Sequence, residues 1–127
     1  MKALTIRQPW AWAIIHAGKD IENRSWRTHH RGALAVHAAK GLTRREYEEF
    51  AQFYNRLRKN RSRLPTLPPM EELPRGAIIG KVHLADCVEQ SRSPWFFGDF
   101  GFVLERPKAI KARPWTGKLG FFDVPVK

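Results

Sequence analysis

The chain has 127 residues, of which 43% are hydrophobic and 12% aromatic, a composition that excludes disorder and predicts one domain over residues 1–127. Its single cysteine, Cys87, excludes an internal disulfide and a cysteine-based zinc site. The sequence contains no run of about 18 apolar residues, so we expect neither a membrane span nor an export signal. With 23 Lys and Arg against 12 Asp and Glu, the formal net charge is +11, which favours a polyanionic partner for a protein that we expect in the cytoplasm.

In the first third of the chain, the pattern predicts three strands around one short helix. Residues 3–6 alternate weakly, as is typical of a strand. A proline at the first helical position begins a helix over residues 9–17, which carries apolar residues at helical spacing and ends at Gly18. Residues 19–24 and 32–38 follow as two further strands, and we expect both in the interior of a sheet.

The rest of the chain predicts one amphipathic helix and three more strands. A capping box formed by Thr43 and Glu46 begins a helix that runs to about residue 59. Four prolines between residues 64 and 75 indicate a surface loop. Further strands are expected at residues 77–89, 101–104 and 119–124. Several strands with two interposed helices indicate an α+β fold, in which a small, strongly bent sheet or β-barrel is flanked by helices.

Asp86 interrupts the alternation of the strand expected at residues 77–89. Val82 and Leu84 share the apolar face of that strand, and Asp86 falls on the same side. Two interpretations remain open: a β-bulge turns the side chain outward, or the carboxylate faces a pocket.

The positive charge is concentrated in the middle of the chain. Between Arg24 and Arg63 there are eleven basic residues and three acidic ones, a local surplus of eight positive charges. Each phosphate that a cation neutralises releases condensed counterions, so such a surface gains affinity for nucleic acid without reading its sequence. An inert basic surface and attraction to anionic lipid are the alternatives, but no amphipathic lipid-anchoring segment accompanies the charge.

A dense polar cluster lies at the two ends of the first predicted helix. That helix is only about 14 Å long at 1.5 Å per residue, so a strand that returns beside the first one brings these side chains together. The cluster offers cations for phosphate and a carboxylate for proton transfer, and its alternative is a surface network of salt bridges. Its members are Arg7, Gln8, Lys19, Asp20, Glu22, Asn23 and Arg24.

Tryptophan is the second signal, with five residues in a chain of this length. An aromatic ring between arginines is typical of a site that stacks an unpaired base while cations hold its backbone. Trp26 and Trp95 are the candidates for this role, whereas Trp10 fits the apolar face of its helix and is expected in the core. The arginines that accompany Trp26 are Arg24, Arg27 and Arg31.

Metal, cofactor and nucleophile motifs are weak or missing in the sequence. His29 and His30 form a loop pair without acidic neighbours, and His83 with Asp86 on one strand has poor ligand geometry. His37 is expected to be a hydrogen-bonded core histidine. There is no glycine-rich phosphate loop, zinc-finger spacing or serine elbow, so we expect neither a metal nor a cofactor.

Several segments resemble the ASCH domain, a branch of the PUA-like superfamily, in its stand-alone bacterial form. LTIRQPWAW and GKDIENRSW, at residues 4–12 and 18–26, carry the most specific likeness. The resemblance implies a β-barrel flanked by helices, with a cleft that handles RNA in related domains. Further matching segments follow in order at residues 31–32, 36–38, 80–87, 93–96 and 117–122.

The activities that this resemblance implies are ribonuclease action and, in one branch, hydrolysis of acetylcytidine. In that branch a catalytic lysine is followed three positions later by a threonine; Lys19 matches the lysine, and Glu22 stands at the threonine position. Our leading hypothesis is that a basic cleft of this protein binds single-stranded RNA or a nucleotide. In a ribonuclease, Glu22 or Asp86 would take the 2′-hydroxyl proton while Lys19 stabilises the reacting phosphate. A non-catalytic binding module remains the alternative, and the sequence does not separate the two or give the oligomeric state.

Overall fold

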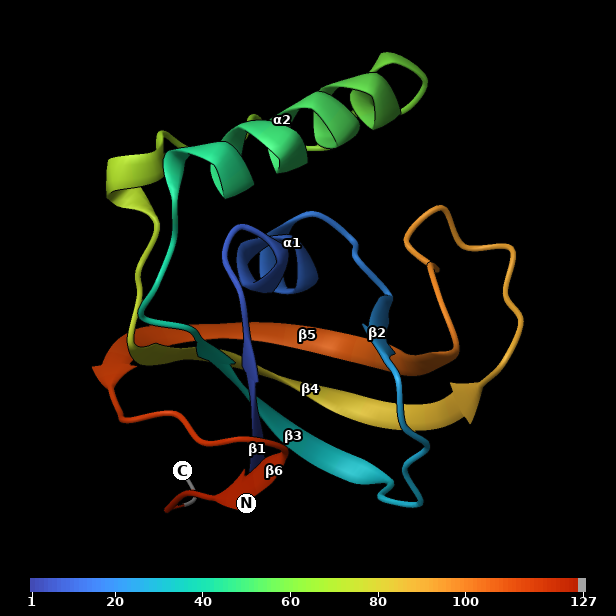
Figure 1. The fold of residues 1–127 in the computed structure, drawn as a ribbon, viewed down its shortest axis with the longest axis vertical. Helices are drawn as coiled ribbons and strands as arrows, with labels where there is room; N and C mark the ends of the chain where they lie inside the picture. Colours follow the sequence, from blue (N-terminus) through green and yellow to red (C-terminus); the bar gives the residue numbers. More distant parts are fainter. Residues whose placement is uncertain (126–127) are drawn as a thin grey trace.

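The computed structural model describes residues 1–125, which form one curled sheet and two α-helices. The expected α+β fold, with a small bent sheet flanked by helices, is confirmed (Figure 1). No helix in this described part is long and apolar enough to cross a membrane. The elements are β1 (Lys2–Ile6), α1 (Trp10–His16), β2 (Ile21–Arg24), β3 (Gly32–Ala38), α2 (Arg44–Lys59), the 3-10 turn η1 (Met70–Glu72), β4 (Ala77–Val88), β5 (Phe100–Pro114) and β6 (Phe121–Asp123).

The sheet runs in the order β2-β5-β4-β3-β1-β6. The β1–β3 pair is parallel, and the other neighbouring pairs are antiparallel. The long strands β4 and β5 curve, so the sheet curls into a half-barrel whose edge strands, β2 and β6, lie on either side of an opening (Figure 1).

Helix α1 is buried between the sheet and α2. Ala11, Ile14 and Ile15 pack with apolar residues of β1, β3, β4 and β5, while Trp12 and Ala13 pack with residues of α2. A helix that is apolar on all sides belongs in an interior, and Figure 1 shows α2 covering α1 on the side away from the sheet. This placement fixes the segments on both sides of α1, which carry the polar cluster.

Helix α2 is the predicted amphipathic helix. The Thr43 side chain accepts a hydrogen bond from the Glu46 backbone, and the Glu46 carboxylate accepts one from the Thr43 backbone, which completes the capping box. Phe50, Tyr54 and Leu57, spaced four and three residues apart, are its buried face.

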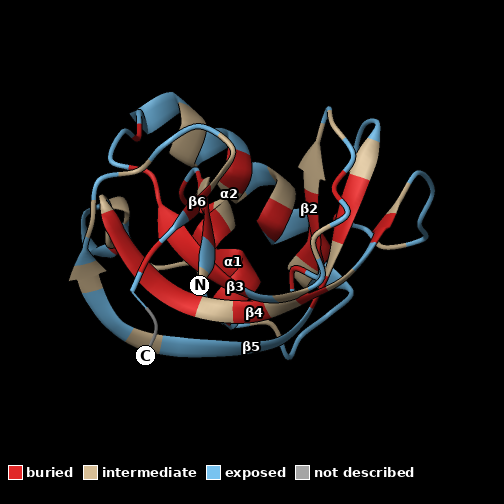
Figure 2. Cartoon of the chain, turned by 90° about the horizontal axis from the view of Figure 1, so that it is seen from below, coloured by how far each residue is buried: buried red, intermediate tan, exposed pale blue. Residues whose placement is uncertain are grey.

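Strand β5 is much longer than the sequence predicts. The prediction covered residues 101–104, but β5 continues to Pro114. Its second half is mostly exposed and lacks the alternation of a half-buried strand, as the pale outer ribbon of β5 in Figure 2 shows. This second half is a strand because it pairs with β4. The register of the pair shifts at Arg106, whose φ is 52°, and Pro107, which the ladder leaves unpaired.

Candidate nucleic-acid interface

The candidate site lies where the curled sheet stays open. Strand β6 pairs with Lys2 to Leu4 of β1, so within residues 1–125 the β1 edge beyond Leu4 has no strand partner on that side. Arg24, at the end of edge strand β2, reaches this edge and donates from Nη2 to the Thr5 carbonyl oxygen at 2.9 Å. A side chain therefore bridges the gap that backbone pairing leaves.

A cavity of about 550 Å³ lies at this opening, between the end of β1, the start of α1 and β2. It is in the size range of small-ligand sites. The structure thus brings together six of the residues that the sequence singled out, from both ends of α1. They are Arg7, Lys19, Glu22, Asn23, Arg24 and Trp26.

At the centre of the site, one carboxylate pairs with two cations. Lys19 Nζ lies 3.3 Å from Glu22 Oε1, and Arg24 donates to Glu22 Oε2 from Nε at 3.1 Å. The side chains are 1%, 10% and 22% exposed for Lys19, Glu22 and Arg24 respectively. With one negative and two positive groups, this trio carries a net positive charge next to the cavity.

Lys19 is almost completely enclosed. Its ammonium also donates to the Ile21 carbonyl oxygen and lies 5.6 Å from the centre of the Trp10 ring. Burial lowers the pKa of Lys19 from its ordinary value, against the opposing effect of the Glu22 carboxylate. Lys19 therefore orients Glu22 and adds positive potential from below the cavity surface.

Trp26 and Arg24 are the groups best placed to contact a ligand. The Trp26 ring packs edge-on against Phe102 and Phe121, with centroid distances of 5.2 and 5.3 Å, and remains partly exposed where it lines the cavity. Within residues 1–125, no hydrogen bond uses the Nη1 group of Arg24. An aromatic ring and a guanidinium group with free donors thus share one cavity.

Arg7 lines the same cavity but is already paired. Its guanidinium donates to Glu46 from Nε at 3.0 Å and from Nη2 at 2.6 Å, which ties the end of β1 to the start of α2. Hydrogen bonding from Arg7 lowers the pKa of Glu46 to about 2, with help from the Thr43 backbone. About half of the Arg7 side chain remains exposed, so it still presents charge to solvent.

Gln8 and Asn23 have structural roles. Gln8 is 1% exposed and does not line the cavity; it donates to the Pro74 carbonyl at 2.8 Å and accepts from the Trp12 backbone at 2.9 Å. Asn23 donates to the Trp95 carbonyl at 2.9 Å and accepts from the Phe97 backbone at 2.7 Å. These side chains shape the walls of the site, and Gln8 offers nothing to a phosphate.

The structure corrects the expectation that Trp95 stacks a base. Trp95 is 3% exposed and packs among Trp10, Phe50, Phe53 and Tyr54. Trp95 follows Pro94 in a turn, and this turn folds inward against α2, where the ring is part of the core.

Arg27, Arg31 and Asp86 lie outside the cavity. Arg27 pairs with Glu89 at 2.8 Å. Arg31 lies 3.6 Å from Asp86, whose side chain accepts from the Cys87 backbone at 2.8 Å. The register of β4 against β5 shifts between Leu84 and Asp86, so the bulge interpretation is correct and Asp86 is exposed. The pocket interpretation, and with it Asp86 as a base beside Lys19, is wrong.

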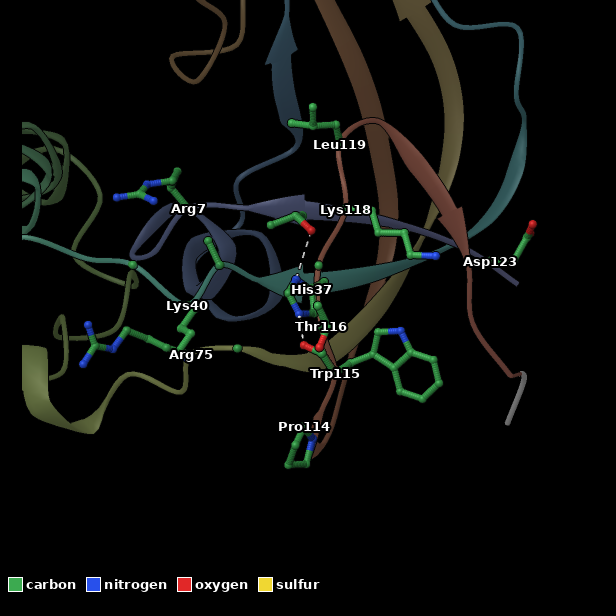
Figure 3. Close-up of a pocket in the computed structure, with 15 residues that line it drawn as sticks. Arg7, His37, Lys40, Arg75, Pro114, Trp115, Thr116, Lys118, Leu119 and Asp123 are labelled. Carbon is green, nitrogen blue, oxygen red and sulfur yellow. Dashed lines mark hydrogen bonds between the residues drawn. The ribbon is translucent and has the colours of Figure 1, made fainter.

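A second hollow, of about 1200 Å³, lies at the same end of β1 and was not anticipated (Figure 3). Its cations come from loops that are far apart in the sequence, so no local motif marks them. They are Lys40, Arg75 and Lys118, in addition to Arg7.

As for metals, in the described part of the chain no three His, Cys, Asp or Glu side chains gather into a group that could hold an ion.

Comparison with known proteins gives a consistent family match. The sequence profile of the ASCH domain matches residues 4–115. The chain is 32% identical over 131 aligned positions to human Activating signal cointegrator 1 and 31% identical to its mouse counterpart, in each case over 91% of this chain. It spans only 22% of the length of those two proteins, so the likeness concerns one part of them.

Proposed function

Since this chain belongs to the ASCH domain family, we propose that the cavity between β1 and β2 binds single-stranded RNA or a nucleotide. The observation that carries the proposal is the meeting of the Trp26 ring with the Arg24 guanidinium in one cavity. A base stacks on the ring, and its phosphate accepts from Arg24 while Arg7 and Lys19 add positive potential.

Several features favour an unpaired nucleotide over a duplex. Trp26 lies within a cavity of about 550 Å³, so a base must leave its stack to reach the ring. Stacking on an aromatic side chain contributes about 1–3 kcal/mol per base and accepts any base. The net charge of +11 adds attraction to the phosphate backbone that does not depend on sequence.

Fluorescence anisotropy with a labelled uridine octanucleotide tests the proposal. Trp26→Ala should weaken binding about 5- to 150-fold, the equivalent of one lost stack. Trp26→Phe, which keeps an aromatic ring, should retain most of the affinity. Because Trp26 also packs in the core, a second variant avoids the core: Ser25→Glu places a carboxylate on an exposed residue that lines the cavity.

The matched control for Ser25→Glu is Gln90→Glu, which makes the same change in net charge at an exposed position outside the cavity. Ser25→Glu should weaken binding much more than Gln90→Glu does. Equal effects of the two carboxylates, together with full binding by folded Trp26→Ala protein, would reject the cavity as the binding site.

Hydrolysis at the same cavity is a second candidate function, favoured by the buried Lys19. A buried lysine with a lowered pKa, in contact with a carboxylate at a cavity, is typical of catalytic sites. Glu22 Oε1 already pairs with Lys19 and Oε2 with Arg24, however, so Glu22 can accept a proton only if one of these two cations moves away. We therefore place binding first, and ribonuclease action or hydrolysis of a modified nucleoside such as acetylcytidine second.

Incubation of the protein with end-labelled RNA and with acetylcytidine, each with and without a chelator, separates these functions. Products that disappear in Lys19→Met and Glu22→Gln variants would establish hydrolysis. RNA that is retarded but intact, with acetylcytidine unchanged, would remove the enzymatic candidate.

A further inference from the structure

The second hollow is bounded by the segment from Pro114 to Leu119, which we call the 114–119 strap. The strap crosses over β1 and β3 and forms one wall of the hollow, with Lys118 on it (Figure 3). Lys40 and Arg75 stand on the opposite side in this view, near Arg7. The Lys118 side chain extends from the strap toward Asp123, away from Arg7, Lys40 and Arg75, so the cations of the hollow lie on both sides of the strap (Figure 3).

His37 fixes the strap in place. Its Nε2 donates to the Trp115 carbonyl oxygen at 2.6 Å, and its Nδ1 accepts from the Thr5 hydroxyl at 3.0 Å. Gly117 lies directly on this pair, because a Cβ there would come 2.6 Å from Thr5 Oγ1 and 2.8 Å from His37 Cε1. These contacts hold the strap against Thr5 and His37 of the sheet, and Lys118, the next residue of the strap, lines the hollow.

The charge around the hollow is poorly neutralised. Asp123 is the acidic residue among its lining residues. Within residues 1–125, neither Lys40 nor Lys118 has a carboxylate within 4.0 Å, and Arg75 donates to a backbone oxygen, that of Leu42, at 3.4 Å. Positive charges around a concave surface concentrate the electrostatic field there and attract anions.

The two cavities meet at the end of β1. Thr5 and Arg7 line both of them, so the Arg7 side chain stands at their junction. From this continuity we propose that the 114–119 hollow binds phosphates of the same RNA strand whose base stacks on Trp26, and that the strand crosses β1 at Arg7. This inference rests on the proposed function.

A continuous strand fits the hollow better than a single free anion does. The volume of about 1200 Å³ exceeds the usual range for one small ligand. The cations are spread along the hollow on both sides of the strap and do not converge on one point, an arrangement that suits phosphates spaced along a chain (Figure 3).

The test compares the binding of a uridine octanucleotide, uridine 5′-monophosphate and inorganic phosphate, each titrated at several salt concentrations. Lys40→Ala/Lys118→Ala should weaken the octanucleotide and leave the monophosphate unchanged. For a single strand, the slope of log K against log salt should fall by about 0.7 for every phosphate that is no longer neutralised, so the double variant loses up to about 1.4. The matched control, Lys108→Ala/Lys111→Ala, removes the same charge from exposed positions on β5.

Three results would overturn the inference. The first is an octanucleotide slope equal to that of the control, and the second is an equal loss for octanucleotide and monophosphate, which indicates a general field. The third is weakened binding of inorganic phosphate with intact octanucleotide binding, which indicates a free-anion site. If the unaltered protein binds neither the octanucleotide nor the monophosphate, the proposed function fails as well; if it binds the monophosphate alone, only this inference fails. If Ser25→Glu weakens binding and the lysine variant does not, only this inference fails.

Discussion

Removal of Glu22 should destabilise the fold far more than removal of an ordinary ion pair. Lys19 and Glu22 are buried, with 1% and 10% of their side chains exposed. Glu22→Leu leaves the Lys19 ammonium with the Ile21 carbonyl and the Trp10 ring as its remaining contacts. Breaking one partner of a buried pair costs about 3–5 kcal/mol, and we expect a loss in that range at about pH 7.

A double-mutant cycle shows whether the loss comes from the unpaired charge. Lys19→Met should cost less than Glu22→Leu, because Glu22 keeps its hydrogen bond from Arg24 Nε and its ion pair with Arg24 Nη2. In Lys19→Met/Glu22→Leu no buried charge is left alone, and Arg24 keeps its bond to the Thr5 carbonyl. The double variant should therefore lie within about 1–2 kcal/mol of the unaltered protein.

The pH dependence of Glu22→Leu gives an independent check. Burial lowers the pKa of Lys19 below 10.5, and the Glu22 carboxylate is the largest influence that raises it again. Between the lowered pKa and 10.5 the unfolded chain binds a proton that the folded one does not, so stability rises with pH in that window. Without Glu22 the folded-state pKa of Lys19 falls further and the window begins at a lower pH, so stability should rise more between about pH 7 and about pH 10 in Glu22→Leu than in the unaltered protein.

Urea unfolding followed by far-UV circular dichroism, at about pH 7 and about pH 10, measures all of these quantities. A cost of less than about 1 kcal/mol for Glu22→Leu, the value of an exposed pair, would show that the variant leaves no buried charge unpaired. A loss in the double variant equal to the sum of the two single losses would show the same.

Two further predictions concern side chains that position the walls of the site. Asn23→Ala removes the hydrogen bonds to Trp95 and Phe97, so it should cost about 1–3 kcal/mol in urea unfolding and speed amide exchange at Phe97; unchanged exchange there would contradict the role. Glu46→Gln keeps the capping box but loses the charge that pairs with Arg7, and since this pair is exposed, it should cost only about 0.5–1 kcal/mol above pH 5. Because the pKa of Glu46 is lowered from 4.5 to about 2, that difference should shrink as the pH falls from about 4.5 and disappear below about pH 2; a difference that is undiminished at about pH 2 would contradict it.

The sequence was most informative where the site is built from one continuous stretch. The end of β1, α1 and β2 follow one another within residues 2–24, so a short helix and a returning strand suffice to bring Arg7, Lys19 and Arg24 together. The capping box at Thr43 was equally local, and the structure has it as predicted. Local geometry decided these features, and local geometry can be read from the sequence.

Features that depend on distant pairing were missed. The second half of β5 has the composition of a loop and is a strand because β4 pairs with it. Trp95 lies in a turn whose inward direction is set by the Asn23 side chain and by α2. Lys40 and Lys118 are 78 positions apart, and they meet around one hollow because Gly117 lets the strap lie on His37. None of these relations leaves a signal within a short window of sequence.

The arrangement of donors around Arg24 bears on how a ligand would bind. Its Nε and Nη2 groups are used by Glu22 and Thr5, which fixes the guanidinium plane across the opening of the sheet. Within the described residues, its Nη1 group makes no hydrogen bond, so a phosphate can bind there without breaking either link. The conformational entropy of the Arg24 side chain is therefore already lost on folding and is not lost again on binding. Ligand affinity should thus depend on Glu22, even though Glu22 and the ligand are both negatively charged. Removal of Glu22 frees a cation but also loosens its plane, and the second effect should be visible as a faster dissociation rate.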